Sequence, residues 1–175
     1  MLKFIFLLLF SGVVNANSCV VLLYHHFAND TPKSTSISPE LFEKHLQYLQ
    51  QNSFKVLPLS TMLNRLKSAT LPDKCVVLTA DDAYISIAKN AYPLLKKYQM
   101  SMAVFVPTDA VEKQYKRYMS WQQMQKIQGE NMEFYNHSLS HPHLLDLDSG
   151  QVLDEIKNAQ KRLRKHLKVT AKILA

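Results

Sequence analysis

Two short groups of residues in this chain have side chains suited to catalysis. Asp81 and Asp82 are adjacent carboxylates, and His137 and His141 are imidazoles separated by Ser-Leu-Ser. A catalytic metal needs about three protein ligands and an open position. Asp82, His137 and His141 offer such a set, which leaves Asp81 free to take a proton from the attacking water. Two histidines and a carboxylate suit zinc, iron, cobalt or nickel better than calcium or magnesium. The pattern points to hydrolysis of an amide or ester.

Both groups follow segments that we expect to be strands. The aspartates come after Cys75-Val-Val-Leu-Thr-Ala, a run typical of a strand buried on both faces of a parallel sheet. The histidines come after a second expected strand, residues 132–135. Ligands bind at the carboxyl ends of parallel strands, so the four side chains should meet at one edge. Alone, an aspartate pair is more often a cap or turn, and a histidine pair is often only surface histidines.

Strands and helices alternate along the chain, which predicts one α/β domain with a mainly parallel sheet. Besides 75–80, the expected strands span residues 19–24, 54–57, 103–106, 132–135 and 171–174, the first of them buried. Helices should begin at the caps Ser38, Ser60 and Ser120 and at Asp148 or Ser149. Another should cover residues 84–98 and bend at Pro93.

Composition excludes several classes of function. The chain has 175 residues, enough for one domain, and 47% of them are hydrophobic, as in an ordinary globular protein. Three glycines and the lack of a Gly-rich phosphate loop argue against nucleotide-dependent chemistry. Much of the net charge of +7 lies in residues 161–168, on what we expect to be the solvated face of a helix. No nucleic-acid-binding motif is recognisable, so nucleic acid is not an expected partner.

The N-terminus resembles a signal peptide that covers residues 1–16 and is cleaved after Ala16. Its apolar run is too short to span a bilayer comfortably. The remaining domain, residues 17–175, should therefore be exported to the periplasm or the extracellular space without a transmembrane segment. Cys19 and Cys75 either pair there or are two small buried hydrophobic residues.

The two catalytic groups also resemble a known family. Thr79-Ala-Asp-Asp-Ala-Tyr84 resembles the Thr-Phe-Asp-Asp-Gly motif of NodB-like polysaccharide deacetylases (carbohydrate esterase family four), and His137-Ser-Leu-Ser-His-Pro142 resembles the family's second motif. Tyr24-His-His-Phe and Ser120-Trp121 resemble the branch that acts on poly-N-acetylglucosamine.

The resemblance implies a distorted parallel β/α barrel and a divalent metal, most often zinc. It also implies removal of N-acetyl or O-acetyl groups from an acetylated polysaccharide. By position, Asp81 is similar to the catalytic base, and Asp82, His137 and His141 are similar to the metal ligands.

The chain departs from the family pattern in two ways. Ala80 and Ala83 stand where the family usually has Phe and Gly. The sequence also stops before the third motif, so we expect a C-terminally truncated, incomplete barrel with an open edge and low stability on its own. A missing C-terminal half or an oligomer could complete it. Loss of an oxyanion donor alone lowers a rate by about 10²–10³. The alternative function is therefore a weak or inactive relative that binds metal or glycan.

Overall fold

The structure is a computed structural model that describes residues 18–129 and 131–175, so the expected signal peptide lies outside the described residues. The strands are β1 Cys19–Tyr24, β2 His26–Phe27, β3 Ser36–Ile37, β4 Lys55–Val56, β5 Cys75–Ala80, β6 Met102–Val106 and β7 Met132–Asn136. The α-helices are α1 Pro39–Gln51, α2 Leu59–Lys67, α3 Tyr92–Tyr98, α4 Thr108–Glu112, α5 Trp121–Ile127 and α6 Ser149–Leu167. A π-helix, η1 Ile87–Ala91, and a 3₁₀ turn, η2 Leu144–Asp146, complete the order.

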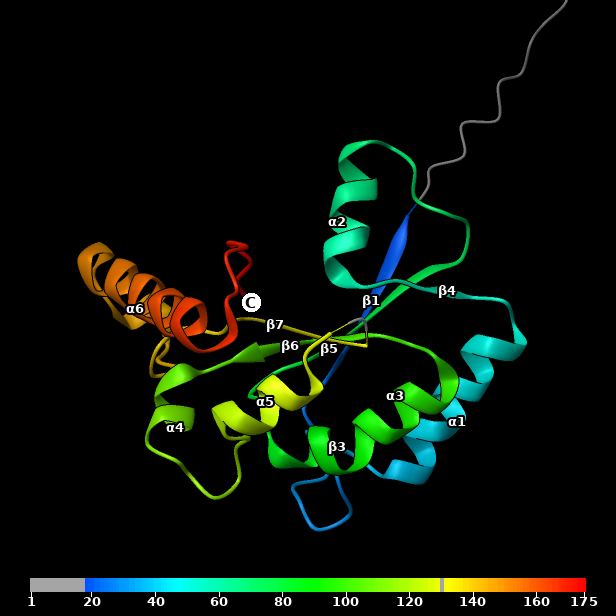
Figure 1. The fold of residues 1–175 in the computed structure, drawn as a ribbon, viewed down its shortest axis with the longest axis horizontal. Coiled ribbons are helices and arrows are strands. Elements are labelled where there is room, and N and C mark those ends of the chain that lie inside the picture. The colour runs from blue at the N-terminus through cyan, green and yellow to red at the C-terminus, as the bar shows by residue number, and fades with distance from the viewer. Residues whose placement is uncertain (1–17, 130) are drawn as a thin grey trace, which may run out of the picture.

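The main sheet is parallel and runs in the order β1-β5-β6-β7, while β4 pairs with the first two residues of β5. Tyr24 pairs with Ala80, Ala80 with Val104, and Val106 with Asn136. These pairs bring the carboxyl ends of all four long strands to one edge. Figure 1 shows α1 and α3 side by side on one flank of the sheet and α6 beside β7. The α/β class and the partial parallel barrel are as expected.

Residues on β5 and β6 alternate between two hydrophobic clusters, as strands covered on both faces should. Val76, Leu78 and Ala80 belong to the larger cluster, which also holds the apolar faces of α1, α5 and α6. Cys75 and Val77 belong to the smaller cluster, beneath α2. Side chains therefore pack on both faces of β5, and this packing fixes the position of the strand end that the two aspartates follow.

The strand β1 is an edge strand, and the expectation that it is buried is wrong. Val20, Val21 and Leu23 are each at least half exposed. In the described part of the chain β1 has one neighbour in the main sheet, β5. Aliphatic residues alone cannot tell a central strand from an edge strand whose outer side lacks a neighbour. Within the described residues, this edge of the sheet is therefore open and apolar.

The two cysteines pair in a disulfide between β1 and β5. Cys19 and Cys75 are direct neighbours in the register of these strands, and the bond closes a loop of 56 residues. Closing a loop of that length stabilises a fold by about 4 kcal/mol in the chain-entropy model. The bond holds β1 against β5. Of the two alternatives that the sequence offers for the cysteines, pairing is the correct one.

Most helices begin as the sequence predicts. Ser38 and Ser120 accept hydrogen bonds from the first turns of α1 and α5, and Asp148 caps α6 with Gln151 as its partner. Ser60 is different: it lies inside α2, which begins at Leu59, and it hydrogen-bonds Glu133 on β7. A carboxylate from another element thus takes the place of the predicted cap.

Two other segments differ from expectation. The expected helix over 84–98 is a π-helix followed by α3, and Pro93 lies in the first turn of α3, where its missing N–H is tolerated. The expected last strand over 171–174 is wrong, because only Leu174 forms a bridge, to Asn136. From Ser18 onward, Glu130 apart, no helix has the length and apolar character to cross a bilayer.

Candidate metal and catalytic site

The structure brings all four predicted site residues together at the carboxyl ends of β5 and β7. Oδ1 of Asp82 lies 3.8 Å from Nε2 of both His137 and His141, and the two Nε2 atoms are 2.9 Å apart. We call Asp82, His137 and His141 the metal cradle. Asp81 lies beside the cradle, with Oδ2 at 4.0 Å from Nε2 of His137.

The loop that carries the aspartates has an uncommon backbone. Asp82 and Ala83 both adopt positive φ, 69° and 53°. Aspartate tolerates this region, whereas an alanine there costs roughly 1–2 kcal/mol. The alanine that replaces the family's usual glycine is therefore at a position where the backbone does favour glycine. Hydrogen bonds hold the loop in this shape: Asp81 N donates to the Tyr24 carbonyl at 3.0 Å, and Met119 N donates to the Ala83 carbonyl at 2.9 Å.

The histidine loop is held by the N-terminus of α4 and by one side chain of α6. Thr108 N and Asp109 N donate to the carbonyls of Ser138 and Leu139 at 3.3 and 2.7 Å. From the other side, the Glu155 carboxylate accepts hydrogen bonds from Leu139 N at 2.9 Å and from Ser140 N and Oγ, both at 2.8 Å.

These contacts matter because His141 is exposed and has positive φ, so burial does not fix its position.

The ring of His137 is oriented by the C-terminal segment. Its Nδ1 lies 2.6 Å from the backbone oxygen of Ala175. Because that oxygen can only accept a hydrogen bond, Nδ1 carries the proton, and the lone pair of Nε2 points into the cradle. A backbone oxygen on the outer nitrogen is the usual partner of a metal-binding histidine.

Asp81 is the candidate base beside the cradle. Burial raises the pKa of its carboxyl, and the neighbouring His137 and His25 oppose that shift. Its Oδ2 lies 3.8 Å from Nε2 of His25, and its Oδ1 is buried without a hydrogen-bond partner among the described residues. Oδ2 is the oxygen on the side of the cradle, and a carboxylate oxygen there can accept a proton from a bound reactant.

Tyr84 and His26 form one wall of the site. Their rings stack at 3.6 Å, and burial together with the Asp82 carboxylate raises the pKa of the Tyr84 hydroxyl. Burial lowers the pKa of His26. His25 lies beside Asp81, with Nε2 at 3.8 Å from Oδ2, and His26 is a buried partner of Tyr84.

The cradle fits a transition metal. Two ligands that each bind zinc at up to about 2.1 Å are at most about 4.2 Å apart. The three donor atoms are separated by 2.9, 3.8 and 3.8 Å, and they are two imidazole nitrogens and one carboxylate oxygen. Calcium and magnesium would need more oxygen ligands than these residues offer.

Glu155 should matter for metal binding, although it touches no metal ligand side chain. Replacing it with Gln leaves fewer acceptors for the three loop donors, so the His141 loop loses its fixed position. Outer partners of metal ligands contribute about 10–100-fold to affinity. We expect Glu155→Gln to weaken zinc binding within that range in a competition titration with a chromophoric chelator. Asp154→Asn, an exposed carboxylate next to it on α6, is the matched control. Equal affinities for the two variants would contradict this role.

The comparisons with known proteins agree with this geometry. A family model described as polysaccharide deacetylase matches residues 68–175. The chain belongs to the polysaccharide deacetylase family. This range includes both catalytic motifs, so the NodB-type resemblance seen in the sequence is confirmed.

One relative of the chain is a poly-β-1,6-N-acetyl-D-glucosamine N-deacetylase from Staphylococcus aureus. The two sequences are 24% identical over 93% of this chain and 60% of the relative's length. The structure is similar to the deacetylase PplD of Streptococcus pyogenes in complex with acetate (TM-score 0.79, 29% identity, 86% of this chain and 69% of that one). It has the fold of IcaB from Ammonifex degensii (TM-score 0.79, 21% identity, 90% of this chain and 73% of that one).

The chain spans 50–60% of the length of the curated relatives that it matches.

Sequence reasoning missed two parts of this deacetylase-family site. Glu155 lies on α6, far along the chain from the loop it holds, and no spacing rule links the two. Tyr84 closes the first motif and begins the expected helix, but no local pattern indicates that its ring stacks on His26. An aromatic side chain two residues after Asp82 is the signal that could have placed it in the site.

Proposed function

We propose that the chain is a metal-dependent hydrolase that removes N-acetyl groups from a polysaccharide such as poly-N-acetylglucosamine. The observation that carries the proposal is the convergence of Asp82, His137 and His141 within reach of one ion, with Asp81 beside them. Membership of the deacetylase family supports the reaction, and the N-deacetylase among its relatives supports the substrate.

Each residue has a distinct part in this proposal. A zinc ion held by the cradle would polarise the acetyl carbonyl and acidify a water molecule. Asp81 would accept the proton of the attacking water at Oδ2, the carboxylate oxygen that faces the cradle 4.0 Å from His137 Nε2, helped by a pKa that burial raises. Glu155 and the backbone oxygen of Ala175 hold His141 and His137 in place. His25, at 3.8 Å from Asp81, is the nearest histidine that could move a proton toward the leaving amine.

We also propose that the mature protein acts outside the cytoplasm, as residues 17–175 after cleavage of a signal peptide at residues 1–16. The disulfide between Cys19 and Cys75 supports export, because structural disulfides persist mainly in oxidising compartments. The substrate of the Staphylococcus aureus relative is consistent with this location.

The experiment that tests the function is acetate release from N-acetylglucosamine oligomers. The chain loaded with zinc should release acetate, and the chain stripped with a chelator and dialysed should not until zinc is restored. Release that is the same before and after stripping would contradict the metal dependence. If the protein binds zinc stoichiometrically but releases acetate from none of the acetylated glycans, the second candidate function is favoured.

That second candidate is a metal- or glycan-binding relative with little activity. It is favoured by one observation: the chain spans only 50–60% of the matched curated relatives. The matched part contains the cradle and the proposed base, so the two candidates differ in turnover and not in metal binding.

A further inference from the structure

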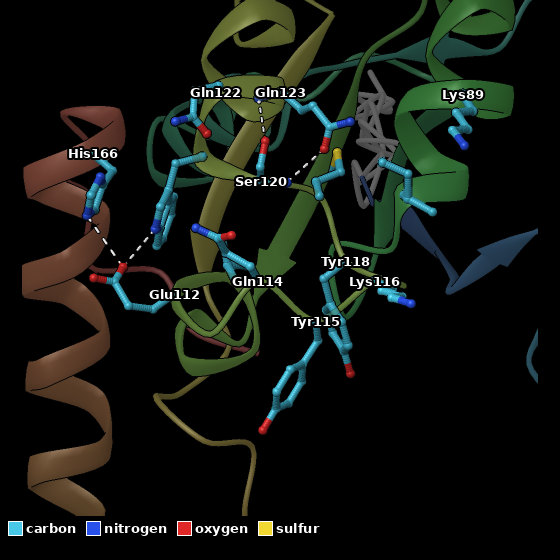
Figure 2. A pocket seen from close by; sticks show the side chains of 14 residues that line it. Lys89, Glu112, Gln114, Tyr115, Lys116, Tyr118, Ser120, Gln122, Gln123 and His166 are labelled. Atoms are coloured by element: carbon cyan, nitrogen blue, oxygen red, sulfur yellow. Dashed lines mark hydrogen bonds and ion pairs between the residues drawn. The ribbon is translucent and has the colours of Figure 1, made fainter.

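A pocket of about 700 Å³ opens between α4, α5 and η1, lined largely by residues 111–123. Figure 2 shows Tyr115 and Tyr118 next to each other on one side of the pocket and Glu112 with His166 on the other. The rings of Tyr115 and Tyr118 are 6.3 Å apart, and that of Tyr115 is half exposed. Neither tyrosine belongs to the metal cradle or to either family motif.

The pocket is joined to the catalytic loop. Tyr84, two residues after Asp82, forms an antiparallel bridge with Tyr118, and their rings are 5.0 Å apart. Ile85 N also donates to the Arg117 carbonyl at 2.8 Å. The rings of Tyr84, Tyr118 and Tyr115 therefore form a continuous row from the cradle into the pocket, which we call the tyrosine row.

Side-chain contacts connect the residues of the far wall of the pocket. Trp121 is buried, its Nε1 donates to Glu112 Oε2 at 2.8 Å, and its ring stacks on His166 with centroids 4.5 Å apart. The Glu112 carboxylate is thus engaged by Trp121 and lies 3.6 Å from His166.

The chemistry of the lining suits a neutral sugar. A pyranose has apolar ring faces that pack on aromatic rings and a polar rim of hydroxyl and acetamido groups. The tyrosine row offers aromatic surface with hydroxyl tips, and Gln114 and Gln122 offer amides that both donate and accept hydrogen bonds. Lys89 and Lys116 also line the pocket and have no carboxylate within ion-pair distance in the described ranges. Their charge disfavours a sugar that carries a free ammonium group.

We propose that the tyrosine row and its pocket form a subsite for the N-acetylated sugar units next to the one held at the cradle. The inference rests on the proposed function, since it assumes that a polymeric glycan is the substrate. The protein would then bind long acetylated oligomers better than short ones, and would bind acetylated neighbours better than units that have already lost their acetyl group.

The test is a binding titration that needs no turnover. Trp121 is the only tryptophan of the chain and lines the pocket, so its fluorescence reports on the subsite. We expect the hexamer of N-acetylglucosamine to bind more tightly than the dimer and to change Trp121 emission. Tyr115→Ala should weaken hexamer binding by about threefold to tenfold, the scale of one aromatic contact, and leave binding of the N-acetylglucosamine monomer unchanged. Tyr115→Phe should retain most of the affinity.

Tyr48→Ala is the matched control, because Tyr48 is also more than half exposed but lies on α1. The hexamer of glucosamine without acetyl groups should bind more weakly than the acetylated hexamer, and Lys116→Gln should narrow that difference. Affinity independent of length, or unaffected by Tyr115→Ala, would overturn the subsite. If the protein releases acetate but binding does not depend on Tyr115, the proposed function holds and the subsite is wrong. If binding depends on Tyr115 but no acetate is released, the subsite holds and the proposed function is wrong.

Discussion

His137→Ala should lower the affinity of the protein for zinc by more than about 100-fold. That figure is the upper end of the effect seen when only an outer partner of a metal ligand is removed, and His137 is proposed as a ligand itself. Its Nε2 lies 2.9 Å from His141 Nε2 and 3.8 Å from Asp82 Oδ1. The measurement is a competition titration with a chromophoric chelator at neutral pH.

His143→Ala is the control for this loss, because His143 is exposed and lies two residues beyond His141. It removes an imidazole from the same stretch and should leave zinc affinity unchanged. Asp82→Asn, which alters the cradle from the other strand, should resemble His137→Ala. Wild-type affinity in His137→Ala, with the far-ultraviolet spectrum retained, would show that the cradle is not the metal site.

The features that the sequence predicts well are those fixed by neighbouring residues. The run 75–80 is apolar on both faces, and β5 is covered on both faces. Ser38, Ser120 and Asp148 cap their helices because a short polar side chain reaches a backbone N–H only a few residues away. The two motifs meet because parallel strands bring their carboxyl ends to one edge.

The features that the sequence does not predict depend on distant partners. Ser60 does not cap α2, because it lies inside the helix and hydrogen-bonds the Glu133 carboxylate on β7. The exposure of β1 arises because residues 18–129 and 131–175 place no strand on its outer side, which no local pattern records. Glu155 looks like any other charged residue of a solvated helix until the fold brings the histidine loop against it.

The position of Ala83 shows how the two kinds of information combine. The sequence marks it as a departure from the family's glycine, and the backbone shows that it has the positive φ that makes glycine common there. Ala83 keeps this unfavourable backbone conformation while its carbonyl accepts a hydrogen bond from Met119 N and its side chain is fully buried. The aspartate loop therefore keeps its shape through contacts with the segment that also lines the pocket.

Asp81→Asn should lower acetate release from N-acetylglucosamine oligomers by about 10²–10⁴, the usual contribution of a positioned general base. An amide has nearly the same shape but cannot accept the proton of the attacking water, so the substitution removes the chemistry and keeps the packing. Zinc affinity should change little, because Asp81 is not among the three cradle ligands. Asp146→Asn, an exposed aspartate in η2, should leave both quantities unchanged. If Asp81→Asn kept the rate, another group would be the base; if it lost zinc as well, Asp81 would be a ligand, and the division of roles between the two adjacent aspartates would have to be reversed.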